Sequence, residues 1–405
     1  MKQAVAKYFS LLLKDELCDI LAFFDVPVGK TAKKAELVQK VTDCMVDDPV
    51  AWLDKMSEMD LHVLREVSRT ETGLLIIDNP EFPMLLESLH LMFQTEIDGK
   101  TCTIVELCPE LKAIVGQFID EVIDMKEADG SFRLERIFLG YLNLYGVLTL
   151  GDFVELMCDA FESDGSGYQM AMRMASNLLV GELRCIYKDE VWFVSPFVDD
   201  YAYFIDGREN FEEIEHYRKF TPDEAEMAGL GMPYCLIGAA TPEGTALVQM
   251  LFDLGLDENA VREELHNIFL NSQYMMENDT AECIFDVVNS RMDDIDSFAG
   301  YRRCIDIMAA YTNSLPKWLL RGHSSEDVGM LKLSIKVDDD SQMPEEEDVP
   351  MVGENGEVFQ NAPTFEGPVT DFFVNGLTIR HVAPDAPCPC GSGLSYRNCH
   401  GKHFS

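Results

Sequence analysis

The side chains best suited to bind a metal gather near the end of this sequence, in the stretch APCPCGSGLSYRNCHGKHFS that covers residues 386–405. One residue separates Cys388 from Cys390, and Cys399 and His400 follow after eight more. Three thiolates and one imidazole make a closed tetrahedral site, which favours zinc and leaves no open position for catalysis. A stretch this short cannot build its own core, so metal binding would supply its folding energy. The spacing therefore predicts a structural zinc site with the ligands Cys388, Cys390, Cys399 and His400.

The same stretch resembles the SEC-C motif, the zinc-binding tail of the SecA translocase motor and of many otherwise unrelated bacterial proteins. The shared residues are Cys388, Pro389, Cys390, Gly391, Ser392, Gly393, Tyr396, Cys399, His400 and Gly401. The resemblance implies bound zinc and a protein partner that docks on the motif. The family usually has lysines after the Gly-Ser-Gly, where this chain has Leu394 and Ser395. No Walker-type phosphate loop is present, so the resemblance does not extend to the translocase motor.

A different metal site could come from glutamates that precede a histidine by three residues. The pairs are Glu87/His90, Glu213/His216 and Glu263/His266. On a helix this is the spacing of di-iron carboxylate bundles, which need two further inward-facing glutamates. Glutamate is so frequent here that about one such pair is expected by chance. Because no nucleophile elbow, dinucleotide fingerprint or HExxH motif is present, we expect no enzyme, with a metalloenzyme built on these pairs as an alternative.

The charge of the chain restricts its partners. Its 405 residues include 72 acidic and 32 basic side chains, a formal net charge of −40. Such a field disfavours nucleic acid, which binds mainly through Lys and Arg, and it disfavours anionic membrane surfaces. The sequence has no run of apolar residues long enough to span a membrane and no signal-peptide pattern at its start. Nine of the twelve cysteines are scattered singly, as in a reducing compartment, so we expect a cytoplasmic protein without membrane contact.

Residues 1–48 form the first expected domain, because residues 1–45 carry seven lysines against six acidic residues. Two helices are predicted from apolar residues that share a face, Leu17, Ile20, Leu21 and Phe24 in one and Leu37, Val38, Val41 and Met45 in the other. The junction GKTAKKAELV between them resembles that of SAP and Rho-N-terminal-like modules. The nucleic-acid contacts that this resemblance implies would be made by Lys30, Lys33, Lys34 and Lys40.

The middle of the chain divides into three segments by periodicity. Residues 49–133 are expected to be helical, with GLLIIDN and TCTIVELC as either short strands or buried helical turns. Residues 134–200 predict three helices and then a hairpin around Lys188 and Asp189, the order of a winged helix. That segment has four basic and eleven acidic residues, which favours a structural or protein-binding role over DNA binding. Residues 201–336 are expected to form a helical domain.

The end of the chain changes character twice. Residues 337–379 contain eleven acidic residues and no Lys or Arg, which predicts an acidic linker. Residues 380–405 then carry the predicted zinc site. The whole sequence predicts a mainly α protein with a multi-helical body, a winged-helix-like α+β segment and a small C-terminal zinc knuckle. The leading hypothesis is a zinc-binding adaptor that binds a protein partner through its tail, and the alternative is a nucleic-acid-associated regulator acting through its N-terminal module.

Overall fold

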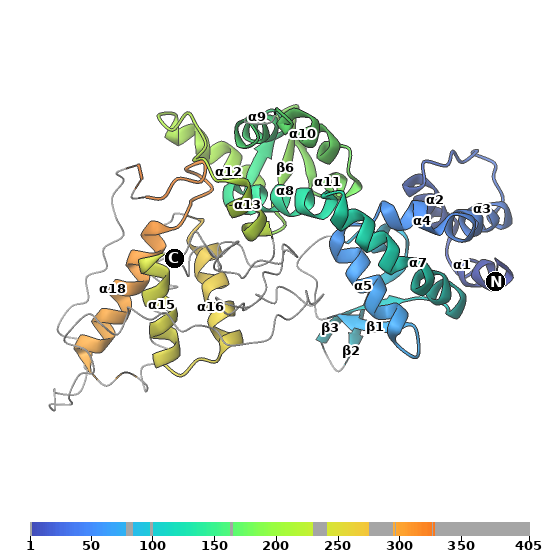
Figure 1. Ribbon diagram of the computed structural model, residues 1–405, viewed down its shortest axis with the longest axis horizontal. Helices are drawn as coiled ribbons and strands as arrows, with labels where there is room; N and C mark the ends of the chain where they lie inside the picture. The colour runs from blue at the N-terminus through green and yellow to red at the C-terminus, as the bar shows by residue number, and fades with distance from the viewer. Residues whose placement is uncertain are drawn as a thin grey trace. The chain divides into compact units, whose positions relative to one another are not determined.

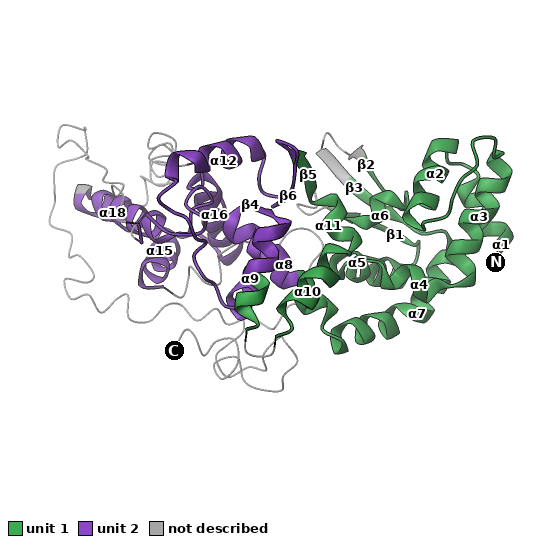
Figure 2. Cartoon of the chain, turned by 90° about the horizontal axis from the view of Figure 1, so that it is seen from above, with its two compact units in different colours: residues 1–135, 157–186, 372–377 green, residues 136–156, 187–371, 378–405 purple. Residues whose placement is uncertain are grey.

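The computed structural model describes residues 2–77, 84–97, 100–162, 165–229, 241–274, 295, 297–325 and 327–328, and Figure 1 shows its ribbon. Contacts divide the chain into two compact units, coloured separately in Figure 2. Within the described residues, unit 1 comprises 2–135 and 157–186, and unit 2 comprises 136–156 and the residues from 187 onward. The fold is mainly helical with small antiparallel sheets, which confirms the predicted mainly α class at this level.

Unit 1 contains most of the N-terminal half of the chain. Its elements are α1 (Lys2–Phe9), α2 (Lys14–Phe23), α3 (Lys34–Asp47), α4 (Pro49–Asp54), α5 (Glu58–Arg69), β1 (Leu74–Ile77), α6 (Leu85–Ser88), β2 (Met92–Ile97), β3 (Lys100–Glu106), α7 (Pro109–Ala128), α10 (Gly167–Ala175), α11 (Leu178–Glu182) and most of β5 (Arg184–Tyr187). The start of α8 (Ser131–Tyr145) and the end of α9 (Leu150–Ala160) also belong to it.

The first helices bury the faces that the sequence predicts. Seven of the eight predicted inward residues are buried, namely Leu17, Ile20, Leu21, Leu37, Val38, Val41 and Met45, while Phe24 is half-buried. A segment of turns and irregular structure, residues 24–33, joins α2 to α3. The assignment of residues 1–48 to the SAP class stays a prediction.

Side-chain caps explain where the next helices begin. Asp48 caps α4, whose first residue is Pro49, and Pro is suited to that position because its missing N–H would have no helical partner. Ser57 and Asp60 form a capping box at the start of α5. Asp60 is fully buried, and it also accepts a hydrogen bond from the backbone N of Leu86 in α6. The box therefore joins α5 to α6 as well as starting the helix.

The segment 49–133, expected to be helical, also contains a three-stranded antiparallel sheet in the order β1-β3-β2. GLLIIDN and TCTIVELC thus include strands rather than buried helical turns. In the register, Ile104 of the central strand lies opposite Ile76 on one side and Phe93 on the other. Val105, the next residue of β3, is fully buried. One face of the sheet therefore belongs to the core of unit 1.

Unit 2 continues from α8 and contains β4 and β6, two strands of a second three-stranded sheet. Its elements are β4 (Val147–Thr149), β6 (Glu190–Val194), α12 (Tyr201–Gly207), the 3₁₀ helix η1 (Arg208–Phe211), α13 (Pro222–Gly229), α15 (Pro242–Asp253), α16 (Glu258–Asn271), α18 (Phe298–Ser314) and most of α8 and α9. The sheet order is β4-β6-β5. Lys188 and Asp189 both have positive φ, 51° and 62°, in the tight turn between β5 and β6. The hairpin predicted around these residues is present, and the winged-helix assignment itself stays a prediction.

Within the described residues, no helix is both long enough and apolar enough to cross a membrane.

Candidate functional site

The four predicted zinc ligands, Cys388, Cys390, Cys399 and His400, lie outside the described residues. Within the described part of the chain, no group of three or more His, Cys, Asp or Glu side chains could hold a metal ion. Several cysteines of that part are also poorly suited to bind one, because burial raises the pKa of the Cys44, Cys108 and Cys185 thiols and raises that of Cys304 to about 11. The described residues therefore offer no zinc site that competes with the one predicted in the tail.

The glutamate–histidine pairs are not arranged as a di-iron centre requires. Glu213 and His216 are both exposed and follow the end of η1, so this pair does not lie on a helix. On α16, Glu263 is exposed whereas His266 is buried, so the two do not face a common site. Glu87 is exposed at the surface of unit 1, and His90 lies 3.8 Å from Asp19 instead.

The lysines of the N-terminal module lie at the start of α3. Lys30, Lys33 and Lys34 are exposed, and no ion pair joins them to another described residue. Lys33 is the N-cap residue of α3 and makes no side-chain capping bond. Lys40, nearly two turns further along α3, has its Nζ 3.7 Å from a carboxylate oxygen of Glu36. Lys33 and Lys34 therefore lie where the helix dipole is positive, a position that disfavours cations.

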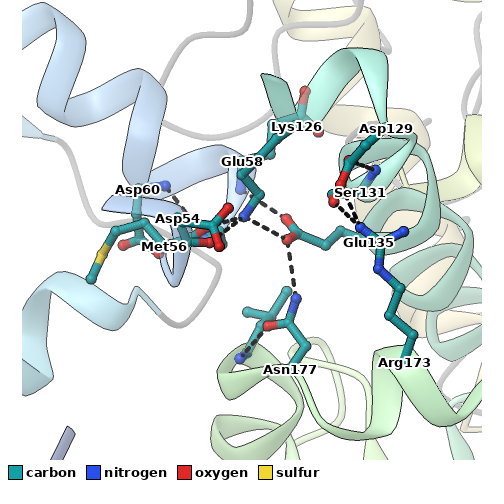
Figure 3. A network of polar contacts seen from close by, with 12 residues as sticks. Asp54, Met56, Glu58, Asp60, Lys126, Asp129, Ser131, Glu135, Arg173 and Asn177 are labelled. Atoms are coloured by element: carbon teal, nitrogen blue, oxygen red, sulfur yellow. Dashed lines mark hydrogen bonds and ion pairs between the residues drawn. The ribbon is translucent and has the colours of Figure 1, made fainter. Parts of the chain in front are cut away.

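A deeply buried ion pair of unit 1 joins Lys126 on α7 to Glu135 on α8 (Figure 3). Their charged atoms are 3.4 Å apart, and the two residues are only 4% and 2% exposed. Lys126 also donates to the backbone carbonyls of Asp54 and Met56, just before α5 begins. The ammonium group thus fixes the turn between α4 and α5 onto α7.

Glu135 completes this cluster by accepting two further hydrogen bonds. The backbone N of Glu58 donates to its carboxylate at 2.8 Å, and Asn177 Nδ2 donates at 3.1 Å (Figure 3). Burial raises the pKa of Glu135, and the adjacent ammonium of Lys126 opposes that shift. The cluster joins α4, α5, α7, α8 and the N-cap of α11. Because its donors and acceptors are matched to one another, its role is structural rather than catalytic.

A second buried cation, Arg208, organises unit 2. Its guanidinium donates to the backbone carbonyls of Tyr145, Val147 and Trp318. It also donates to the Tyr217 hydroxyl at 3.0 Å, and that hydroxyl donates to Asp152 Oδ2 at 3.1 Å. Segments more than a hundred residues apart in the sequence are thereby held by one side chain. Sequence reasoning missed Arg208, whose partners are mostly backbone carbonyls far along the chain.

Lys126 did leave a signal in the sequence. It follows Ile119 and Val122 at helical spacing, so it lies on the buried stripe of α7. A lysine in an apolar stripe indicates a buried ammonium that needs an acceptor.

Comparison with known families bears on the tail. Residues 386–402 match the family model of the SEC-C motif. The chain carries a SEC-C motif. The match includes all four predicted ligands and covers only a small part of the 405 residues, so it assigns no family to the two units. No curated protein and no solved structure matches the chain.

The donor set of the SEC-C motif suits zinc. Its three thiols and one imidazole are the soft and intermediate donors that zinc binds in closed tetrahedral sites, and no carboxylate is needed. Four protein ligands would fill the tetrahedral coordination of zinc, with no open coordination position for a substrate or an activated water. The motif is thus suited to holding a small fold together, and less suited to metal-assisted catalysis.

Proposed function

We propose that this protein is a cytoplasmic, zinc-binding interaction protein whose SEC-C motif is a docking module for a protein partner. The match of residues 386–402 to the SEC-C motif carries the proposal. In it, Cys388, Cys390, Cys399 and His400 bind one zinc ion. The ion holds the short tail in a single shape, because a peptide of this size has no core of its own. The proposal assigns no catalytic role to the protein.

Charge and cysteine usage support the interaction role. Ten of the eleven acidic residues of 337–379 lie before Asp371, so the stretch 337–370 between the body of the chain and the motif is too polar to bury itself. The singly placed cysteines favour a reducing compartment, where the tail thiols stay free to bind metal.

Metal analysis of the purified full chain tests the zinc site. We expect one zinc per chain in the wild type and none in Cys388→Ser, because a tetrahedral site loses most of its affinity with one thiolate. Cys158→Ser is the matched control, since it removes an exposed cysteine of the described part and should keep the zinc. Zinc retained by Cys388→Ser, or two irons bound per chain, would contradict the proposal.

Affinity capture of partners tests the docking role. Wild type and a Cys388→Ser/Cys399→Ser variant are compared as baits at equal concentration, with Cys158→Ser again as the control. The proposal expects at least one partner to be captured by the wild type and the control and lost from the double variant. An identical partner set for all three baits would rule out the docking role.

A second candidate function is nucleic-acid binding through the start of α3. The observation that favours it is the exposure of Lys30, Lys33 and Lys34, the last two at the positive end of the helix dipole, where a bound phosphate would be stabilised. We expect any such binding to be weak and to fall steeply with salt. Lys34→Glu should abolish it while raising stability by about 0.3–1 kcal/mol, since an acidic residue suits the first turn. No binding by the wild type at low salt would end this candidate.

A further inference from the structure

The outer face of the sheet β1-β3-β2 exposes a row of apolar side chains. Ile76 is 48% exposed and Phe93 is 45% exposed, and Ile104 lies between them in the register and is half-buried. Leu74, two residues before Ile76 on the same face, is 37% exposed. Antiparallel sheets with one open face usually carry polar residues on it. An apolar row across three neighbouring strands indicates a surface that another segment covers.

The tail contains a segment that is built to cover such a face. Residues 371–380 read DFFVNGLTIR, in which Asn375-Gly376 lies between two apolar runs. Asn-Gly in this setting is the strongest short-range signal for a two-residue hairpin turn. The turn places Val374 opposite Leu377, Phe372 opposite Ile379, and Asp371 opposite Arg380. The last pair has opposite charges, which adds to the stability of the pairing.

The pleat then sorts these residues into two faces. One face carries only apolar side chains, those of Phe372, Val374, Leu377 and Ile379. The other carries Phe373 and Thr378 beside the charged pair. A second Asn-Gly, at 355–356, lacks this pattern because Glu354 would lie directly opposite Glu357. Like charges in that position are destabilising, so of the two Asn-Gly pairs only the one at 375–376 fits a consistent hairpin.

A two-stranded hairpin with one apolar face is marginal in water and needs a surface to pack against. The chain itself offers such a surface, the outer face of the sheet β1-β3-β2. About 40 residues separate Val328, the last described residue, from Asp371, and a chain of that length can span about 140 Å at most. Because the segment 371–380 is covalently linked to the sheet, its effective concentration at the sheet face is in the millimolar range, far above that of a free partner. The chain's own tail is therefore the favoured occupant of the sheet face.

We propose that residues 371–380 form a β-hairpin that packs Phe372, Val374, Leu377 and Ile379 onto the outer face of the sheet β1-β3-β2. The two apolar faces make a small sandwich of the kind formed by aligned antiparallel sheets. The SEC-C motif begins only six residues after the hairpin, so docking anchors the motif beside unit 1. The hairpin needs no metal, so this inference is independent of the proposed zinc site.

Two adjacent phenylalanines provide a matched test, because Phe372 and Phe373 point to opposite faces of one strand. Side-chain labelling by a photolysed carbene, read by peptide mass spectrometry on the full chain, reports how exposed β1 and β2 are. Phe372→Ser should lower the docked-to-undocked ratio roughly tenfold or more and raise labelling of Leu74–Ile77 and Phe93. Phe373→Ser should leave that labelling at the wild-type level. Ile76→Ser should in turn raise labelling of residues 372–379.

Each outcome decides the inference. It is overturned if both phenylalanine variants change the labelling equally, or if neither changes it. It is also overturned if the protection of β1 in the wild type is lost on dilution, which would identify a second copy as the occupant. Cys388→Ser should keep the wild-type labelling, so loss of zinc and loss of docking are distinguishable.

Discussion

Gly140 on α8 and Gly229 on α13 lie against each other's helix backbone. A Cβ added to Gly140 would be 1.7 Å from the carbonyl oxygen of Ala225, and one added to Gly229 would be 1.8 Å from that of Arg136. Real Cβ atoms do not approach a carbonyl oxygen so closely. The two helices of unit 2 can therefore pack at this distance only because both positions lack a side chain.

We predict that Gly140→Ala destabilises the protein by at least about 2 kcal/mol, because α8 and α13 must move apart to admit one methyl group. Urea denaturation followed by circular dichroism measures the change. Gly181→Ala is the matched control, since that glycine lies on α11 with nothing within 4 Å of an added Cβ. Its stability should stay the same or rise by about 0.5 kcal/mol. Equal destabilisation by both substitutions would contradict the close approach.

Local patterns predicted the parts of this fold that local forces decide. The apolar faces of α2 and α3 follow from 3.6-residue periodicity, and the turn at Lys188-Asp189 follows from the alternation on either side of it. The strands β1 and β3 stayed undecided, because short apolar runs fit a strand or a buried helical turn equally well. Only their pairing, with Ile76 opposite Ile104, distinguishes the two.

The candidate site divides in the same way. The SEC-C motif was predicted from the sequence, because its ligands lie within thirteen residues of one another and the match to the family model covers them. Arg208 could not be predicted, since its acceptors at Tyr145 and Trp318 are brought to it only by the fold of unit 2. The spacing of Glu213 and His216 suggested a metal-binding pair on a helix, but both residues follow the end of η1 and do not lie on a helix.

Arg208→Lys should destabilise the protein by about 3 kcal/mol. The guanidinium has five N–H donors, and all of its hydrogen bonds to Trp318, Val147, Tyr145 and Tyr217 lie inside the protein. A lysine has three donors on a single atom, so at least one buried carbonyl would lose its partner. Arg218→Lys is the control, because Arg218 pairs with Asp327 at the surface and should cost under about 1 kcal/mol. Similar losses for the two variants would count against the buried role.

Lys126→Met should cost about 3–5 kcal/mol, because it leaves the buried carboxylate of Glu135 without its cation. Burial already raises the pKa of Glu135, and loss of the ammonium should raise it further. When the pKa of Glu135 is higher in the folded chain than its value of 4.5 in the unfolded chain, the folded state is destabilised as the pH rises above 4.5. The variant should therefore regain stability when the pH is lowered from 7.5 toward 5.

The double variant Lys126→Met/Glu135→Gln checks that assignment. It removes both charges and keeps a side-chain oxygen that can accept the hydrogen bond from the backbone N of Glu58. It should recover part of the lost stability at pH 7.5 and should not show the added pH dependence of Lys126→Met. A double variant as unstable and as pH-dependent as the single one would show that the charge of Glu135 is not the cause.

His266 makes the stability of unit 2 sensitive to acid. The ring is buried on α16 against Phe197, with ring centroids 5.0 Å apart, and burial lowers the pKa of His266 from 6.5 to about 4. The unfolded chain therefore takes up a proton between pH 6.5 and 4 that the folded chain does not. The contribution of the neutral His266 ring to the free energy of unfolding is complete above pH 6.5. It decreases as the pH falls, and the loss reaches about 3 kcal/mol at pH 4.

Comparing His266→Leu with the wild type isolates this effect, because the carboxylates that titrate in the same range are common to both. Each protein's free energy of unfolding is measured by urea denaturation at intervals from pH 7.5 to 4.5. The wild type should lose more stability over that range than His266→Leu, with the difference developing below pH 6.5. His216→Leu, which removes an exposed ring, should follow the wild-type curve. Parallel curves for wild type and His266→Leu would show that the ring does not resist protonation in the fold.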